Sequence, residues 1–124
     1  MRIERELMRG AGPVAVLSLL STGEMYGYEL VEALASRTEG VLDMGQSTLY
    51  PLLYNLEAKG LVDSERRRSD HGRERKYYTL TGSGRRRLEA DRAQWQAVTV
   101  AMRELGVVVR GLLGSEPGPH AALG

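Results

Sequence analysis

The sequence predicts a mainly α-helical fold with one small β-hairpin (an α+β fold), and three features carry this prediction. Apolar residues recur at helical spacing through most of the chain, whereas residues 61 to 80 form two short strand-like runs separated by small and polar residues. The helical segment before these runs ends at Gly60. A helix followed directly by a basic β-ribbon is the arrangement of a winged helix-turn-helix, here with a long C-terminal helix added.

The composition is that of one small domain with an additional element. The chain of 124 residues has no cysteine, which excludes disulfides and thiolate metal sites and fits the cytosol. No apolar run approaches the roughly 20 residues that cross a bilayer. The N-terminus lacks the apolar core of a secretion signal. We therefore expect a cytoplasmic protein without membrane contact.

Helices are expected through most of the first 40 residues. A short amphipathic helix precedes Gly10 and Gly12. A second, mostly apolar helix starts at Pro13, a good first-turn residue, and should be the central buried helix. A third spans residues 26 to 37, and Gly40 is its expected stop.

The next helix, which starts near Gln46, has two contrasting faces. Its apolar stripe follows i, i+3, i+4, i+7 spacing and consists of Leu49, Leu52, Leu53 and Leu56. The opposite face is small, polar and aromatic, and consists of Ser47, Pro51, Tyr54 and Ala58, with Asn55 beside them. Pro51 is expected in the first turn, where its missing N–H costs little. An uncharged outer face of this kind suits close approach to another surface.

The hairpin is expected to pair residues 61 to 67 with residues 75 to 80 around a turn. Its inner-face candidates are Val62, Tyr78 and Leu80. Residues 66 to 87 contain nine basic and two acidic residues, a net charge of +7, which leaves about −6 for the rest of a chain whose net charge is +1. Such a zone is the electrostatic footprint of phosphate contact, and a solvated charged loop is the alternative.

Thr81 is the expected N-cap of a final helix, residues 82 to 113, which is followed by a flexible tail, residues 114 to 124. Two heptad series run along this helix: Leu88, Trp95, Met102 and Val109, and then Val98, Leu105 and Leu112. Asp91 breaks the second series and Gly106 weakens the helix. A seam this narrow indicates packing against another helix or subunit, with an intramolecular core helix as the alternative.

No enzyme is expected. His71 and His120 have no carboxylate partner at metal-ligand or triad spacing, and the sequence contains no phosphate loop or nucleophile motif. Gly82-Ser83-Gly84 precedes a helix and could meet an anion, but no βαβ unit precedes it. We therefore expect neither a metal nor a cofactor.

Four motifs together resemble the PadR family of bacterial transcriptional regulators. They are YGYEL at 26–30, TLYPLL at 48–53, LEAKGL at 56–61 and RKYYTLT at 75–81, and the resemblance covers about residues 10 to 105. The single C-terminal helix is similar to the compact subgroup that includes the multidrug-sensing regulator LmrR. The resemblance implies a homodimeric winged-helix repressor on a palindromic operator, with the last helix forming the dimer.

The resemblance also bears on effectors. It implies that some relatives release DNA on binding a phenolic or planar aromatic compound, and that in LmrR-like members a tryptophan on the last helix stacks on such ligands. Trp95 lies on the corresponding helix, so it is a candidate for ligand binding as well as for the dimer core. Whether this chain senses a small aromatic effector stays open.

The predicted function is therefore sequence-specific binding of double-stranded DNA, with residues 1 to 81 as the DNA-binding domain and residues 82 to 113 as the dimerisation helix. The residues expected at the major groove or its walls are Gln46, Ser47, Thr48, Tyr50, Tyr54 and Asn55. Those expected at the backbone or minor groove are Arg73, Arg75 and Lys76. The expected dimer contacts are Leu88, Trp95, Val98, Met102, Leu105 and Val109.

Two alternatives stay open. One is a winged-helix module that binds protein partners, and the other is a ligand-binding dimer without DNA-binding activity. DNA binding should depend strongly on salt, whereas protein binding need not.

Overall fold

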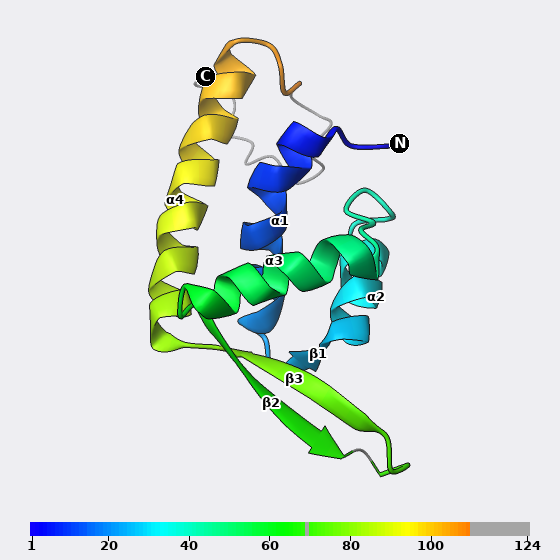
Figure 1. Ribbon diagram of the computed structural model, residues 1–124. Coiled ribbons are helices and arrows are strands. Elements are labelled where there is room, and N and C mark those ends of the chain that lie inside the picture. Colours follow the sequence, from blue (N-terminus) through cyan, green and yellow to red (C-terminus); the bar gives the residue numbers. More distant parts are fainter. Residues whose placement is uncertain (69, 110–124) are drawn as a thin grey trace. The chain divides into compact units, whose positions relative to one another are not determined.

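The computed structural model describes residues 1–68 and 70–109, and the chain divides into two compact units, residues 1–89 and residues 90–124 (Figure 1). The elements of the first unit are α1 (Arg5–Leu20), β1 (Met25–Tyr26), α2 (Gly27–Arg37), α3 (Gln46–Ala58), β2 (Val62–Arg68) and β3 (Glu74–Leu80). The last helix, α4 (Gly82–Glu104), begins in the first unit and continues into the second. The described part of the chain thus has the expected α+β fold.

The three strands form one antiparallel sheet in the order β1-β3-β2. The expected hairpin is confirmed to within about a residue at each end, with Ser64 opposite Tyr78 and Arg66 opposite Lys76. We call this β2–β3 hairpin the wing; Figure 1 shows it projecting away from α1, α2 and α3. Strand β1, which pairs Tyr26 with Tyr77, was not expected, because two residues are too few to show a strand period.

The expected break between two N-terminal helices is wrong, because α1 runs without interruption through Gly10, Gly12 and Pro13. Proline removes one N–H donor, and the hydrogen bonds of the flanking turns hold the helix together around it. Gly12 is buried where α1 meets its neighbours, and a Cβ there would lie 3.0 Å from the Leu52 Cδ1 atom. This glycine therefore marks close packing and not a helix end.

The expected range of α3 is confirmed, and its apolar stripe faces the core, with Leu49, Leu53 and Leu56 buried. Gly60, at φ +75°, ends the helix in the left-handed conformation that glycine adopts without strain. Pro51, however, lies beyond the first turn, because the helix already starts at Gln46. Pro51 has no N–H to donate to the Ser47 carbonyl oxygen. Ser47 is exposed, so water can donate to this oxygen instead.

The core of the first unit joins all of its long elements. Helices α1, α2 and α3 contribute most of it, and β2, β3 and the start of α4 complete it through Val62, Tyr78 and Leu88. Tyr78 is thus the core tyrosine of the Tyr77-Tyr78 pair. Leu88 is only 2% exposed, so its expected place in a dimer seam is wrong, and the residue belongs to the core of its own chain.

Thr81 caps α4 as expected, because its Oγ1 accepts a hydrogen bond from the Gly84 N–H at 2.9 Å. The Gly82-Ser83-Gly84 turn also has a packing role: a Cβ on Gly84 would overlap the Leu61 carbonyl oxygen and come within 2.6 Å of the Leu80 Cδ1 atom. The glycine lets α4 start directly against the backbone that enters the wing.

Helix α4 is shorter than the expected 82 to 113. It ends at Glu104, Gly106 has a φ of +82°, and the Val107 N–H donates back to the Met102 carbonyl at 2.8 Å. Leu105 and Val109 therefore lie outside the helix, which corrects their assignment to a helical seam. Leu112 and the expected tail lie outside the described residues. None of the described helices is both long and apolar enough to span a membrane.

Candidate nucleic-acid interface

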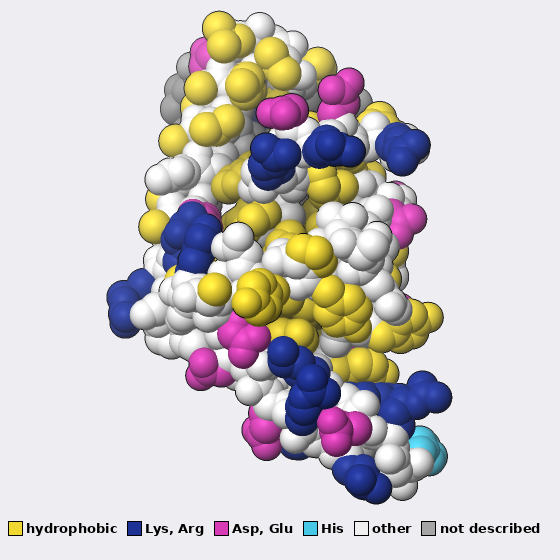
Figure 2. Space-filling view, in the orientation of Figure 1, with side chains coloured by type: hydrophobic (Ala, Val, Ile, Leu, Met, Phe, Trp, Pro, Cys, Tyr) yellow, Lys and Arg dark blue, Asp and Glu magenta, His cyan; other side chains and the backbone are white. Residues whose placement is uncertain are grey.

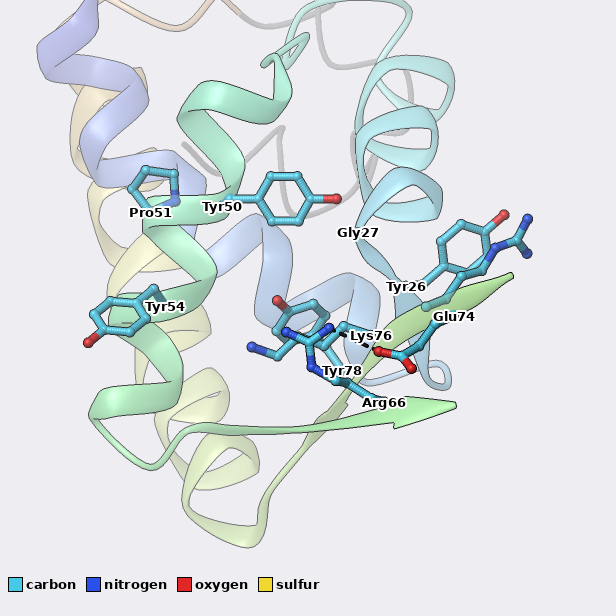
Figure 3. Close-up of a pocket in the computed structure, with 10 residues that line it drawn as sticks. Tyr26, Gly27, Tyr50, Pro51, Tyr54, Arg66, Glu74, Lys76 and Tyr78 are labelled. Carbon is cyan, nitrogen blue, oxygen red and sulfur yellow. Dashed lines mark hydrogen bonds and ion pairs between the residues drawn. The ribbon is translucent and has the colours of Figure 1, made fainter. Parts of the chain in front are cut away.

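A groove of about 710 Å³ lies between α3 and the wing (Figure 3). One wall is the outer face of α3 and the other is the surface of β2 and β3 that faces α3, which we call the inner face of the wing. The residues that line the groove are Tyr26, Gly27, Tyr50, Pro51, Tyr54, Arg66, Glu74, Arg75, Lys76 and Tyr78. Four of the expected DNA-contacting residues, Tyr50, Tyr54, Arg75 and Lys76, therefore come together at one site.

The outer face of α3 is free, as its sequence pattern predicts. All six candidate residues on this helix, Gln46, Ser47, Thr48, Tyr50, Tyr54 and Asn55, are exposed. The Tyr54 side chain is 75% exposed and that of Tyr50 is 41% exposed. Figure 2 shows aromatic and apolar side chains gathered over α3 and α2, directly above the charged wing.

Tyr50 is held in place by the start of α2. Figure 3 shows its ring extending from α3 toward Gly27. A Cβ on Gly27 would lie only 2.7 Å from the Tyr50 Cε1 atom, so the ring can pack here only because residue 27 is glycine. Two motifs that are far apart in the sequence, Tyr26-Gly27-Tyr28 and Leu49-Tyr50-Pro51, thus form one contact.

The inner face of the wing carries cations that are paired with carboxylates. Arg66 lies 3.2 Å from Glu74, and both side chains are largely exposed. The Lys76 Nζ atom lies 3.6 Å from a Glu57 carboxylate oxygen at the end of α3, and 5.6 Å from the centre of the Tyr78 ring. These cations face the groove that the uncharged side of α3 also lines.

The opposite, outer face of the wing carries a separate cluster that ties the wing to β1. The Arg67 guanidinium donates to Glu24 at 2.6 Å and lies 4.0 Å from the centre of the Tyr77 ring. Tyr77 packs edge-on against Tyr26, and the Arg75 guanidinium lies 4.3 Å from the Tyr26 ring centre. Arg75 is thus stacked on an aromatic ring at the edge of the groove, whereas Arg73 is exposed near the hairpin turn.

Tyr78 forms the floor of the groove. Burial, and secondarily the Glu57 carboxylate, raises the pKa of the Tyr78 phenol above its ordinary value. The phenol is therefore neutral at physiological pH, and the positive charge of the groove comes from Arg66, Arg75 and Lys76.

Sequence reasoning assigned no DNA contact to Glu57, which pairs with Lys76, nor to six of the residues that line the groove: Tyr26, Gly27, Pro51, Arg66, Glu74 and Tyr78. The strand period would have identified Arg66, because it lies opposite Lys76 in the antiparallel register. Glu57 lies near the end of α3, and no periodicity or motif in the sequence indicates its contacts with the wing. Tyr26 was assigned to a helix, whereas it forms β1 and accepts the Arg75 stack.

Apart from Leu88, the described part of the candidate dimer seam is exposed in the single chain. Exposed apolar side chains on α4 are Trp95, Val98 and Met102, and Leu105 and Val109 are exposed beyond the helix end. Val100 and Val107 are exposed as well. An exposed apolar surface on a helix and the segment that follows it is typical of a surface that a partner covers.

Comparisons with known proteins give one consistent relationship. Residues 16–90 match the family described as the transcriptional regulator PadR-like family. The chain is 39% identical over 88 residues to the transcriptional regulator Rv3488 of Mycobacterium tuberculosis, which covers 71% of this chain and 78% of that protein.

Solved structures agree with this relationship. A PadR family regulator from Eggerthella lenta has a TM-score of 0.71 at 38% identity, covering 81% of this chain and 85% of its own. A Streptococcus transcriptional regulator has a TM-score of 0.73 at 31% identity, covering 83% and 99% respectively.

Proposed function

Because this chain belongs to the PadR-like family of transcriptional regulators, we propose that it is a sequence-specific DNA-binding regulator that binds duplex DNA through α3 and the wing. One observation carries the proposal: the exposed, uncharged face of α3 and the cations Arg66, Arg75 and Lys76 line one groove. A DNA helix presents base edges beside a row of phosphates, which matches a neutral reading surface beside a cationic one.

The two walls have different tasks in this proposal. Helix α3 enters the major groove, where the Asn55 amide can both donate to and accept from an adenine edge, and the Tyr54 ring can pack against a thymine methyl group. Lys76 and Arg66 contact phosphates, which fixes the position of the protein on the duplex but reads no sequence. Tyr50, held against Gly27, lines the groove between α3 and the cations of the wing.

The DNA-binding proposal predicts different effects for the two classes of contact. Lys76→Ala should weaken binding to all duplexes and reduce the slope of log affinity against log salt by up to about 1. Asn55→Ala should change sequence preference by about 1 to 3 kcal/mol at one base pair, with little effect on random duplex. Selection of genomic fragments on the purified protein, followed by titration at several salt concentrations, measures both effects.

Two results would contradict the proposal. Fragment selection at moderate salt would yield no enriched motif, or binding would be insensitive to salt. A protein-interaction module or a ligand-binding dimer would then be the better account of the groove and the exposed helix.

We also infer that the protein acts as a homodimeric repressor on a palindromic operator in the cytoplasm. The exposed apolar side chains of α4 support a dimer, and two copies of α3 would then contact half-sites about 34 Å apart, one helical turn of DNA. The family resemblance is what supports repression and a palindromic operator. Footprinting on the selected fragments would show two protected half-sites, and a single protected half-site would contradict the dimer.

A small aromatic effector completes the proposed function. Trp95 is an exposed aromatic residue next to Val98 and Met102, and Met side chains adapt to varied ligand shapes. Planar aromatic cations and phenolic acids should quench the fluorescence of Trp95, the only tryptophan, and should weaken operator binding at matching concentrations. Quenching without loss of DNA affinity would remove the sensor role.

A further inference from the structure

Glu57 connects the DNA-facing helix to both strands of the wing. It lies in the last turn of α3, and one carboxylate oxygen accepts a hydrogen bond from the Ser64 hydroxyl on β2 at 2.5 Å. The other oxygen lies 3.6 Å from the Lys76 Nζ atom on β3. About a third of each partner's side chain is exposed, 37% for Lys76 and 33% for Glu57, so solvent screens this pair less than the wing pair of Arg66 and Glu74.

A carboxylate is unfavourable at this position for the helix alone. The C-terminal end of a helix carries partial negative charge, so an acidic residue there is destabilising, and the nearest cation at this end is the C-cap residue, Lys59, outside the last turn of α3. Local helix preference therefore does not explain Glu57. Its partners Ser64 and Lys76 do, and both are on the wing.

Lys76 lines the groove, where the proposed function brings a DNA phosphate. Lys76 cannot pair fully with a phosphate while it is paired with Glu57. Contact with DNA would break the Lys76–Glu57 pair and bring the freed carboxylate close to a second negative charge. Both effects oppose binding.

We propose that Glu57 is an intramolecular counterion of the DNA-binding surface, which occupies Lys76 in the free protein and thereby limits affinity for every duplex. The inference rests on the proposed function, since it concerns how tightly the same groove holds DNA. Glu57 also positions the wing through its hydrogen bond with Ser64, which we call the tether. The same side chain thus has two roles, counterion and tether.

The counterion role has a consequence for salt dependence. When a phosphate takes Lys76, the freed Glu57 carboxylate takes up a cation from solution, which cancels part of the counterion release. Removing the charge of Glu57 should therefore make the slope of log affinity against log salt steeper, by up to about 0.9.

Glu57→Gln is the central test, because the amide oxygen can still accept from Ser64 while the charge is lost. We expect affinity for random duplex and for the operator to rise about threefold to tenfold near 0.1 M salt. The matched control is Glu65→Gln, which makes the same charge change on the outer face of the wing, where Glu65 is 3.9 Å from Arg67. The control should change affinity less than about twofold. Equal effects of the two variants would overturn the proposal.

Two further variants separate the roles of Glu57. Ser64→Ala removes the tether and keeps the charge, so it should not raise affinity; a rise equal to that of Glu57→Gln would mean that a looser wing, and not a lost charge, explains the effect. In a Lys76→Ala background, the gain from Glu57→Gln should shrink toward that of the control. An undiminished gain would overturn the Lys76 pairing as the cause.

Failure of this inference differs from failure of the proposed function. If the parent binds DNA with a salt dependence that Lys76→Ala reduces, but Glu57→Gln equals Glu65→Gln, only the counterion role is wrong. If the parent binds no duplex at any salt concentration, the proposed function is wrong and the counterion role falls with it. Urea denaturation of each variant confirms that the compared proteins are folded.

Discussion

At the residue scale, two glycines allow elements of the interface to pack closely. Gly27 leaves room for the Tyr50 ring, and Gly84 leaves room for the Leu61 carbonyl at the base of the wing. Neither residue has a positive φ, so both are glycine because of space and not because of backbone conformation. The contact between α2 and α3 that positions Tyr50 thus depends on the absence of one methyl group.

Gly27→Ala should damage both stability and DNA binding. The added Cβ would lie 2.7 Å from the Tyr50 Cε1 atom, so the ring must move or the helices must separate. We expect the free energy of unfolding to fall by about 1 to 3 kcal/mol, as for other overpacked sites. Operator affinity should fall as well, because Tyr50 lines the groove. Urea denaturation and DNA titration measure the two effects.

Gly10→Ala is the matched control for this variant. Gly10 lies inside α1, and an added Cβ would meet no atom within 4 Å. Alanine is the better helix former, so this variant should gain about 0.5 to 1 kcal/mol without any change in DNA affinity. If Gly27→Ala behaved like Gly10→Ala, Tyr50 would not be fixed by this contact.

At the scale of elements, α3 combines two residues that are unfavourable where they lie, Pro51 and Glu57, with a buried leucine stripe. Pro51 interrupts its hydrogen bonds and Glu57 opposes its dipole, yet the stripe holds the helix against the core. Both unfavourable residues are at or beside the groove with the wing. The outer face of the wing, in turn, is fixed to β1 by Arg67 and Tyr77. Stability therefore comes from the buried faces. The residues of α3 that face the groove contribute little to stability, and in the proposed function they bind DNA.

Pro51→Ala should stabilise the protein and weaken DNA binding. Alanine restores the N–H that can donate to the Ser47 carbonyl, and it is the better helix former by about 3 kcal/mol in a helix interior. Part of this gain is offset because proline also restricts the unfolded chain, so we expect a net gain of about 1 to 3 kcal/mol. The loss of the ring from the groove wall should lower operator affinity.

Pro13→Ala tests whether these two effects are separable. Pro13 also lies inside a helix, α1, but does not line the groove. It should raise the free energy of unfolding in the same way and leave DNA affinity unchanged. A Pro51→Ala variant that binds operator as tightly as the parent would show that the ring has no part in the interface.

At the scale of the whole molecule, α4 is buried near its start and exposes apolar side chains farther along. Leu88 belongs to the core of the first unit, whereas Trp95, Val98 and Met102, at or near the same heptad spacing, are exposed in the second. The proposed dimer would cover these exposed side chains. Its stability would then be linked to protein concentration, which is not expected of the core around Leu88.

Charged substitutions at two positions of α4 should have different outcomes. Val98→Glu would bury an unpaired charge in the dimer, at a cost of several kcal/mol, and should shift the sedimentation coefficient toward that of a monomer. Leu88→Glu would place the charge in the core and should unfold the protein at any concentration. Analytical ultracentrifugation and circular dichroism distinguish the two.

The control for Val98→Glu is Gln96→Glu, an exposed position on the same helix outside the heptad series. It introduces the same charge and should leave the oligomeric state unchanged. A parent protein that sediments as a monomer would refute the dimer, and so would a Val98→Glu variant that stays dimeric.

The sequence by itself determined the elements whose signals are local. The leucine stripe of α3, the stop at Gly60, the two strands of the wing and the Thr81 cap each depend on periodicity or capping within a few residues, and all are found in the structure. The same reasoning correctly predicted that α3 would present an uncharged face and that the wing would supply Arg75 and Lys76 beside it.

Only the tertiary structure decided which residues meet across long separations. Arg67 pairs with Glu24, 43 positions away, and Gly27 receives Tyr50 from another helix; neither contact has a period that a sequence displays. Packing also overrode local signals. Pro13 and Pro51 lie inside helices, and Leu88, despite its heptad spacing, is buried in the core of its own chain. Local helix preferences range from a few tenths of a kcal/mol for ordinary residues to about 3 kcal/mol for proline, and burial of a whole apolar face outweighs them.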